Sequence, residues 1–230
     1  MQHYWRNENL SKNIAIDGPA GAGKSTIAKK VAAKLGFIYV DTGAMYRAIA
    51  LLTIRSGIDS ADSAAVSKAC ENADITLKHV DGSQVVFLND ENVNDLIRTE
   101  KVSQMASVTS TYPAVRTKLV ELQRRLSETT DIVMDGRDIG TVVLPNADLK
   151  VFLTASAHVR ALRRLKELSA KGETHELSDI ENEIMERDHR DMTREISPLK
   201  QADDAILVDT SDMSIDEVTD KILDLFAKKN

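Results

Sequence analysis

Short apolar runs alternate with amphipathic stretches along most of this chain. Five runs bounded by turn residues have the length of buried strands, at residues 14–16, 37–40, 132–134, 151–153 and 206–208. Between them, apolar residues recur at helical spacing, as in 26–35 and 113–126. The alternation predicts an α/β fold of three layers, with a central parallel sheet between helices. Ligands of such folds bind beyond the carboxyl ends of the strands, so we expect the functional site there.

One segment departs from this alternation. Residues 75–79 and 85–88 flank Asp81-Gly82, a dipeptide typical of a β-hairpin turn, and a helical stretch at 59–73 precedes them. This pattern predicts a small antiparallel insertion in the α/β core. The expected organisation is a polar tail at 1–12, a core at 13–61 and 108–230, and the insertion at 62–107.

Composition limits the classes of partner. The sequence contains 30 Lys and Arg against 36 Asp and Glu, a net charge of −6 at pH 7, which argues against a broad basic surface for a nucleic acid polymer or an anionic membrane. Cys70 is the only cysteine, which excludes an intrachain disulfide or a multi-thiolate zinc site and fits a reducing compartment. No apolar run approaches the about 18 residues of a membrane helix, and residues 1–13 do not resemble a secretory signal. We therefore expect a cytoplasmic protein.

A phosphate-binding pattern follows the first predicted strand and opens a helix. It satisfies G-x-x-x-x-G-K-[ST] and comprises Gly18, Pro19, Ala20, Gly21, Ala22, Gly23, Lys24, Ser25 and Thr26. Its glycines allow backbone N–H groups to surround phosphate oxygens at the positive end of the helix dipole. We expect Lys24 to reach the β and γ phosphates, Ser25 to help hold Mg²⁺, and Thr26 to lie within reach of phosphate. A plain Gly-rich turn is the alternative, but the strand before and the helix after favour nucleotide binding. The chain lacks the Asp-x-x-Gly and Asn-Lys-x-Asp segments of a GTPase switch.

A stripe of side chains near the C-terminus predicts a second anion site. If residues from Leu177 onward are helical, one face carries, in order, Leu177, Ile180, Ile184, Arg187, Asp191 and Arg194. Packing of the apolar half against the core would carry the charged half toward the cleft, with Arg190 adjoining it. A solvated face with a weak Arg187–Asp191 pair is the alternative.

Three further charged segments follow predicted strands. Asp135 comes directly after the strand at 132–134 and could hold a magnesium water, while Arg137 and Asp138 could face an acceptor. Arg47, after the strand at 37–40, could hold a second phosphate. A basic cluster of Arg160, Arg163 and Arg164 could contact the donor phosphates from a lid reaching into 171–176. Each of these segments could instead form an ordinary turn or a solvated helix face.

Four segments together resemble bacterial cytidylate kinases, in the nucleoside monophosphate kinase class of P-loop proteins. They are the phosphate loop with Ile16 and Asp17, Asp41-Thr42-Gly43-Ala44-Met45-Tyr46-Arg47, Asp135-Gly136-Arg137-Asp138-Ile139-Gly140-Thr141 and Arg187-Asp188-His189-Arg190-Asp191, extended by Ser197-Pro198-Leu199. The resemblance runs in family order from Asn13 to the end. It implies transfer of the γ-phosphoryl group of ATP to CMP or dCMP in pyrimidine nucleotide metabolism, with Mg²⁺, by a monomer with an acceptor-binding insertion and a lid near 160–185.

The same resemblance assigns roles to individual residues. The CMP phosphate would be held by Arg47, Arg137 and Arg194, the sugar hydroxyls by Arg187 and Asp191, and cytosine by Thr42, Ser107, Arg116 and Asp138. The catalytic groups would be Lys24, Arg137, Arg187 and Arg194, with Arg160 and Arg164 on ATP and with Ser25 and Asp135 on the metal. A carboxylate can accept from the cytosine amino group, whereas uracil presents a carbonyl there. A kinase for another small acceptor and an ATP-dependent binding module stay open as alternatives.

Overall fold

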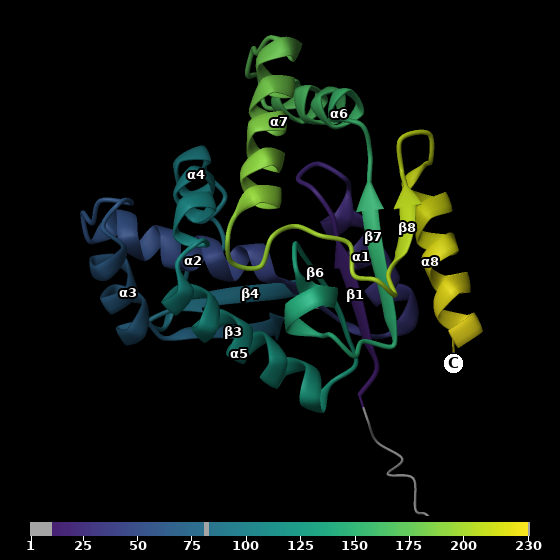
Figure 1. The fold of residues 1–230 in the computed structure, drawn as a ribbon, viewed down its shortest axis with the longest axis horizontal. Helices are drawn as coiled ribbons and strands as arrows, with labels where there is room; N and C mark the ends of the chain where they lie inside the picture. The colour runs from purple at the N-terminus through teal and green to yellow at the C-terminus, as the bar shows by residue number, and fades with distance from the viewer. Residues whose placement is uncertain (1–10, 81–82, 230) are drawn as a thin grey trace, which may run out of the picture.

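The computed structural model describes residues 11–80 and 83–229, which fold around a five-stranded parallel sheet (Figure 1). The strand order is β2-β6-β1-β7-β8, with bounds Ile38–Asp41, Ile132–Gly136, Asn13–Asp17, Leu149–Thr154 and Ile206–Asp209. The register pairs Asp41 with Asp135 and Asp17 with Gly136. The carboxyl ends of β2, β6 and β1 therefore meet at one edge of the sheet.

Helices cover both faces of this sheet, as the apolar runs predicted. The helices are α1 (Lys24–Leu35), α2 (Thr42–Arg55), α3 (Ser63–Asn72), α4 (Glu100–Thr109), α5 (Pro113–Thr129), α6 (Ala157–Ala170), α7 (Leu177–Thr193) and α8 (Ile215–Lys229). Successive residues of β1 enter different cores. Ile14 and Ile16 pack with α1 and α8, while Ala15 packs with α5. Burial on both faces explains why these strands lack a polar alternation, and the three-layer prediction is confirmed.

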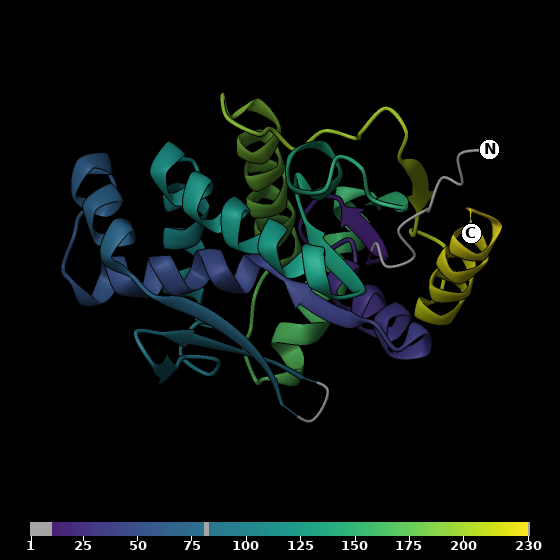
Figure 2. The same ribbon diagram turned by 90° about the horizontal axis from the view of Figure 1, so that it is seen from below.

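A separate antiparallel sheet lies in the region predicted as an insertion. It comprises β3 (Ile75–Val80), β4 (Ser83–Leu88) and β5 (Glu91–Asn92), with Val80 opposite Ser83. The predicted Asp81-Gly82 turn lies outside the described residues. Figures 1 and 2 place this sheet with α3 and α4 at one end of the molecule, with α8 at the other.

Side chains of the β3–β4 hairpin attach it to the edge strand β2. The Gln84 side chain accepts from the Asp41 N–H at 2.8 Å and donates to the Asp41 carbonyl at 3.2 Å. The His79 ring lies 3.0 Å from the Tyr39 carbonyl. These contacts satisfy backbone groups that an edge strand otherwise leaves unpaired.

Two elements differ from the prediction or were absent from it. α3 begins at Ser63 rather than at residue 59, because Asp62 caps it by accepting from the Ala65 N–H at 2.9 Å. A turn of π-helix at Ile139–Val143 follows β6 and has no counterpart in the sequence pattern. Within the residues described, no helix combines the length and apolarity needed to cross a membrane.

Candidate active site

The phosphate loop joins β1 to α1 at the carboxyl edge of the sheet. Gly18 has φ +145°, and a Cβ there would lie 1.9 Å from the Leu153 carbonyl oxygen, so a larger residue would displace β7. α1 begins at Lys24, whose Nζ is buried and donates to the Pro19 carbonyl at 2.7 Å. Burial, and next the positive charge of Arg137, lower the pKa of Lys24 well below its usual value. An anion in the loop would offset both effects and stabilise the charged form of Lys24, so this site favours the binding of phosphate.

Asp135 is the centre of a buried hydrogen-bond network beside the loop. Ser25 Oγ donates to its Oδ2 at 3.0 Å, and the Tyr39 hydroxyl donates to its Oδ1 at 2.7 Å. Burial, and next the charge of Asp41, raise the pKa of Asp135, while Lys24 opposes them.

These oxygen groups fit a magnesium ion. Ser25 uses its proton on Asp135, which leaves the lone pairs of its oxygen free for a cation. Within the described part of the chain, no cluster of three or more His, Cys, Asp and Glu side chains could hold a metal. A site of one carboxylate, one hydroxyl and substrate phosphates is the kind that Mg²⁺ commonly occupies.

Arginines from three elements converge opposite the phosphate loop. Arg137 Nε donates to Asp191 Oδ2 at 2.9 Å. Burial alone would raise the pKa of Asp191, but Arg137 and then Arg187 outweigh it and hold that pKa below its usual value. Burial, and next Arg137, lower the pKa of Arg187 to about 10, and burial lowers that of Arg47 in the same direction.

This cluster leaves buried donors unused. Among the described residues, Arg187 Nε and Arg194 Nη2 have no hydrogen-bond partner. A buried donor without an acceptor costs about 1–3 kcal/mol, so the site favours an anionic ligand that would accept these hydrogen bonds.

The helix that carries this cluster differs in part from the predicted stripe. Ile180 and Ile184 pack against α6, and Asp188 and Asp191 are buried further along α7. Figure 1 shows α6 and α7 beyond the carboxyl ends of the strands. The helix ends at Thr193, so the prediction that the helical period places Arg194 was wrong. Arg190 is exposed. Arg194 adopts an extended conformation that still brings its Nη2 to 3.9 Å from Asp138 Oδ1.

The residues expected around cytosine centre on a buried ion pair. Arg116 and Asp138 are in contact, with side chains 5% and 6% exposed, and the Arg116 guanidinium lies 5.5 Å from the centre of the Tyr46 ring. Thr42 Oγ1 donates to the Asp135 carbonyl at 2.8 Å, which ties this pocket to the network at the loop. Ser107 is half-buried on α4, where its carbonyl accepts from the Ser110 hydroxyl at 3.2 Å.

The structure separates the predicted basic cluster of α6. Arg160 is buried and donates to the Ala20 carbonyl of the phosphate loop at 3.0 Å and to Asp188 Oδ2 at 2.6 Å. Arg163 turns instead to the Thr210 carbonyl at 2.6 Å. Arg164 lies 3.6 Å from Glu100 of α4, with its side chain 39% exposed. Each of the three guanidinium groups therefore has a different protein partner in this structure, and their contact with donor phosphates stays a prediction.

Sequence reasoning did not assign three residues of this site. Tyr39 lies inside an apolar run, which predicts only a position in the core. Asp17 accepts from the N–H groups of Ile139 and Gly140, at 2.8 and 2.7 Å, and so holds the turn that carries Asp138. Asp188 has no role in the sequence prediction, although its pairing with Arg160 joins α7 to α6. The sequence signal that could have identified these residues is a charged or phenolic side chain within a segment that is expected to be buried.

Comparison with known proteins identifies the family. A family model described as cytidylate kinase matches residues 14–228. The chain belongs to the cytidylate kinase family. Within it, a cytidylate kinase of Caldicellulosiruptor bescii is 50% identical over 94% of this chain and 96% of that protein. A cytidylate kinase of Listeria innocua is 52% identical over 94% and 96%. The resemblance on which the sequence analysis relied is thereby confirmed.

Solved structures support the fold of this family member at low sequence identity. A gluconokinase from Sinorhizobium meliloti matches with a TM-score of 0.50 and 14% identity, covering 96% of this chain and 94% of that one. A protein from Eubacterium ventriosum, described as uncharacterized, matches with a TM-score of 0.51 and 12% identity over 94% and 99%. At such identities the likeness concerns the fold alone.

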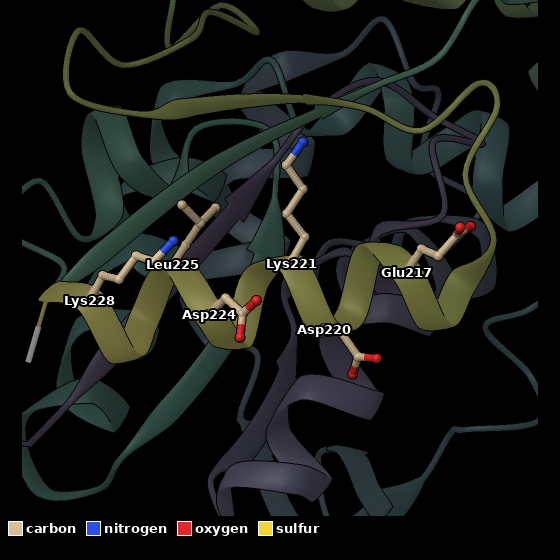
Figure 3. A pocket seen from close by; sticks show the side chains of 6 residues that line it. All are labelled: Glu217, Asp220, Lys221, Asp224, Leu225 and Lys228. Carbon is tan, nitrogen blue, oxygen red and sulfur yellow. The ribbon is translucent and has the colours of Figure 1, made fainter.

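A surface hollow elsewhere does not belong to this site. It runs along α8 and is lined by Glu217, Asp220, Lys221, Asp224, Leu225 and Lys228 (Figure 3). Asp220 is already paired with Lys34 of α1 at 2.7 Å, so the hollow marks the outer side of a helix fastened to the core.

Proposed function

We propose that this member of the cytidylate kinase family transfers the γ-phosphoryl group of ATP to CMP or dCMP, giving ADP and CDP or dCDP. The observation that carries the proposal is the presence of two groups of basic side chains at the carboxyl edge of the sheet, close enough that, in addition to burial, Arg137 and Arg187 lower the pKa of Lys24. The phosphate loop with Lys24 would hold one phosphate, and the arginine cluster, in which Arg187 Nε and Arg194 Nη2 lack hydrogen-bond partners among the described residues, would hold the other. The choice of CMP as acceptor comes from the relatives, because proteins about 50% identical to this chain are named cytidylate kinases.

On the donor side, the loop N–H groups and Lys24 would hold the ATP phosphates. Lys24 would exchange its hydrogen bond with the Pro19 carbonyl for a phosphate oxygen. Ser25 and Asp135 would hold Mg²⁺, which neutralises charge on the bridged phosphates. Arg160 would act on ATP through the phosphate loop, because it donates to the Ala20 carbonyl. Arg164 lies on the side of α6 that faces Glu100 of α4.

On the acceptor side, the arginines would hold a phosphate that is already an anion. The reaction needs no strong general base, because the attacking oxygen carries charge before attack. Arg47, Arg137 and Arg194 would overcome the repulsion between the two phosphates, and Arg187 with Asp191 would meet the sugar hydroxyls. We propose direct in-line transfer without a covalent intermediate, with Lys24, Arg137, Arg187 and Arg194 acting on the transferred group.

The base would be selected by the buried Asp138 with Arg116, Thr42 and Ser107 around it. Asp138 would accept from the cytosine N4 amino group, whereas a uracil carbonyl would face the carboxylate without a hydrogen bond. Movement of the insertion at 62–107 and of a lid near 160–185 would then exclude water and limit ATP hydrolysis. We further propose a cytoplasmic monomer.

The test is phosphorylation of CMP, dCMP, UMP, AMP and GMP with ATP and Mg²⁺, with an ATP-only control and an EDTA control. Preferential CDP and dCDP formation that EDTA abolishes is the expected result. Product mainly from another nucleotide would overturn the base assignment, and acceptor-independent ATP turnover would overturn the kinase mechanism.

A further inference from the structure

We infer that Tyr39 is a positioning residue for the magnesium site, holding the Asp135 carboxylate so that Ser25 presents its lone pairs to the metal. The inference rests on the proposed function for its Mg²⁺–ATP chemistry. It adds a residue outside the phosphate loop and outside the acceptor site.

The Tyr39 hydroxyl is not required for packing. Its ring lies in the apolar cluster between the sheet and α1, and the residue is 8% exposed. Tyr39 pairs with Val133 in the β2–β6 register, two residues before Asp135, so its long side chain reaches along the sheet toward the carboxyl edge. Phe at this position would fill almost the same volume, and the hydroxyl group adds the 2.7 Å hydrogen bond to Asp135 Oδ1 together with an interaction with the Ser25 side chain.

That hydrogen bond fixes the rotation of the carboxylate. Asp135 has two oxygens, and Tyr39 engages Oδ1 while Ser25 donates to Oδ2 at 3.0 Å. With Oδ1 held, Oδ2 stays opposite Ser25 and accepts its proton. The lone pairs of Ser25 Oγ then point away from Asp135, where they are available to a cation. Without the phenol, the carboxylate and the serine hydroxyl can both rotate, and the metal site loses its preorganisation.

The test is the Mg²⁺-dependent part of nucleotide binding in Tyr39→Phe. Calorimetry measures the Kd of AMP-PNP, an ATP analogue that is not turned over, once with Mg²⁺ and once with EDTA. We expect binding to weaken about 10-fold with Mg²⁺ and to be unchanged with EDTA, since loss of an outer hydrogen bond to a metal site typically costs 10–100-fold. The matched control is Tyr112→Phe, which removes a tyrosine hydroxyl that donates to the Ser60 carbonyl, and both of its Kd values should equal those of the unmodified protein.

Two results would overturn the inference. One is unchanged binding with Mg²⁺ in Tyr39→Phe, and the other is an equal loss with Mg²⁺ and with EDTA, which indicates a structural role alone. Circular dichroism establishes that each variant is folded.

A second measurement does not depend on the variant's folding. The sequence has four tyrosines, so ¹⁹F NMR of fluorotyrosine-labelled protein can be assigned through Phe variants at Tyr4, Tyr46 and Tyr112. The remaining Tyr39 signal should shift when Mg²⁺ is added to the AMP-PNP complex, and no shift would overturn the inference. Neither measurement uses an acceptor, so they stand or fall separately from the preference for CMP.

Discussion

Replacing Asp138 by asparagine should destabilise the protein before any effect on substrate is considered. Asp138 and Arg116 form an ion pair whose side chains are 6% and 5% exposed, and Arg194 lies 3.9 Å away on the other carboxylate oxygen. Asp138→Asn keeps the shape but removes the negative charge between two buried arginines. Breaking a buried pair in this way costs about 3–5 kcal/mol, and we expect the lower end because the amide oxygen still accepts one hydrogen bond.

The assay is thermal unfolding followed by circular dichroism at neutral pH. For a chain of this size each kcal/mol lowers Tm by about 2–4 °C, so we expect a decrease of about 6–12 °C. The matched control is Glu121→Gln, which removes the charge from a pair with Arg125 whose side chains are 58% and 66% exposed. It should change stability by less than about 0.5 kcal/mol.

The same variant tests the selection of the base. The ratio of kcat/KM for CMP to that for UMP should fall about 5- to 150-fold, corresponding to 1–3 kcal/mol for one buried hydrogen-bonding mismatch. A Tm within about 2 °C of the unmodified protein would refute the claim that Asp138 is a buried counter-charge. Unchanged discrimination in competition kinetics would refute its role toward cytosine.

Three further predictions concern the loop, the pH dependence of stability and the insertion. Lys24→Ala should abolish CDP formation with an unchanged circular dichroism spectrum, whereas Lys30→Ala, on the exposed face of the same helix, should retain activity. Burial, which outweighs two backbone hydrogen bonds, raises the pKa of Asp17 from 3.8 to about 6, so the native state binds its proton more tightly than the unfolded state does. The contribution of Asp17 to the free energy of unfolding therefore falls by about 2 kcal/mol as pH rises from 4 to 6. In urea unfolding across that range, the difference between the unmodified protein and Asp17→Asn should shrink by a similar amount, and a constant difference would contradict the assignment. Lys118 Nζ donates to the Cys70 and Glu71 carbonyls at the end of α3, at 2.8 and 3.0 Å, so Lys118→Met should cost about 1–3 kcal/mol in urea unfolding. Lys68→Met, at an exposed position of α3, should change the free energy of unfolding by less than about 0.5 kcal/mol. Equal losses in the two variants would contradict the role of Lys118 in capping the end of α3.

Local pattern was sufficient for the parallel strands, the phosphate loop and the antiparallel hairpin. A strand buried on both faces must be apolar throughout, as at Ile14 and Ile16, and a loop that closes around phosphate needs Gly18 where a Cβ would meet a neighbouring strand. The apolar runs and the glycine spacing are visible within short segments of sequence, whereas the close approach of Leu153 to Gly18 is a tertiary contact.

The resemblance supplied the roles of the site residues, and those roles stay predictions until they are measured. Helical spacing could not predict where α7 ends, because the last turn of a helix depends on the contacts of the residues that follow it. Arg194 therefore reaches Asp138 from an extended segment and not from the helical stripe.

The partners of the charged and phenolic groups were decided by the tertiary structure alone. Tyr39 meets Asp135 across 96 residues of sequence, and Asp17 meets Ile139 across 122, through the register of neighbouring parallel strands. Sequence periodicity specifies which face a side chain occupies, but only the order and register of the strands specify which group it faces. For this protein, sequence by itself determined the layers and the phosphate loop, and packing of the layers determined the hydrogen bonds that orient its chemistry.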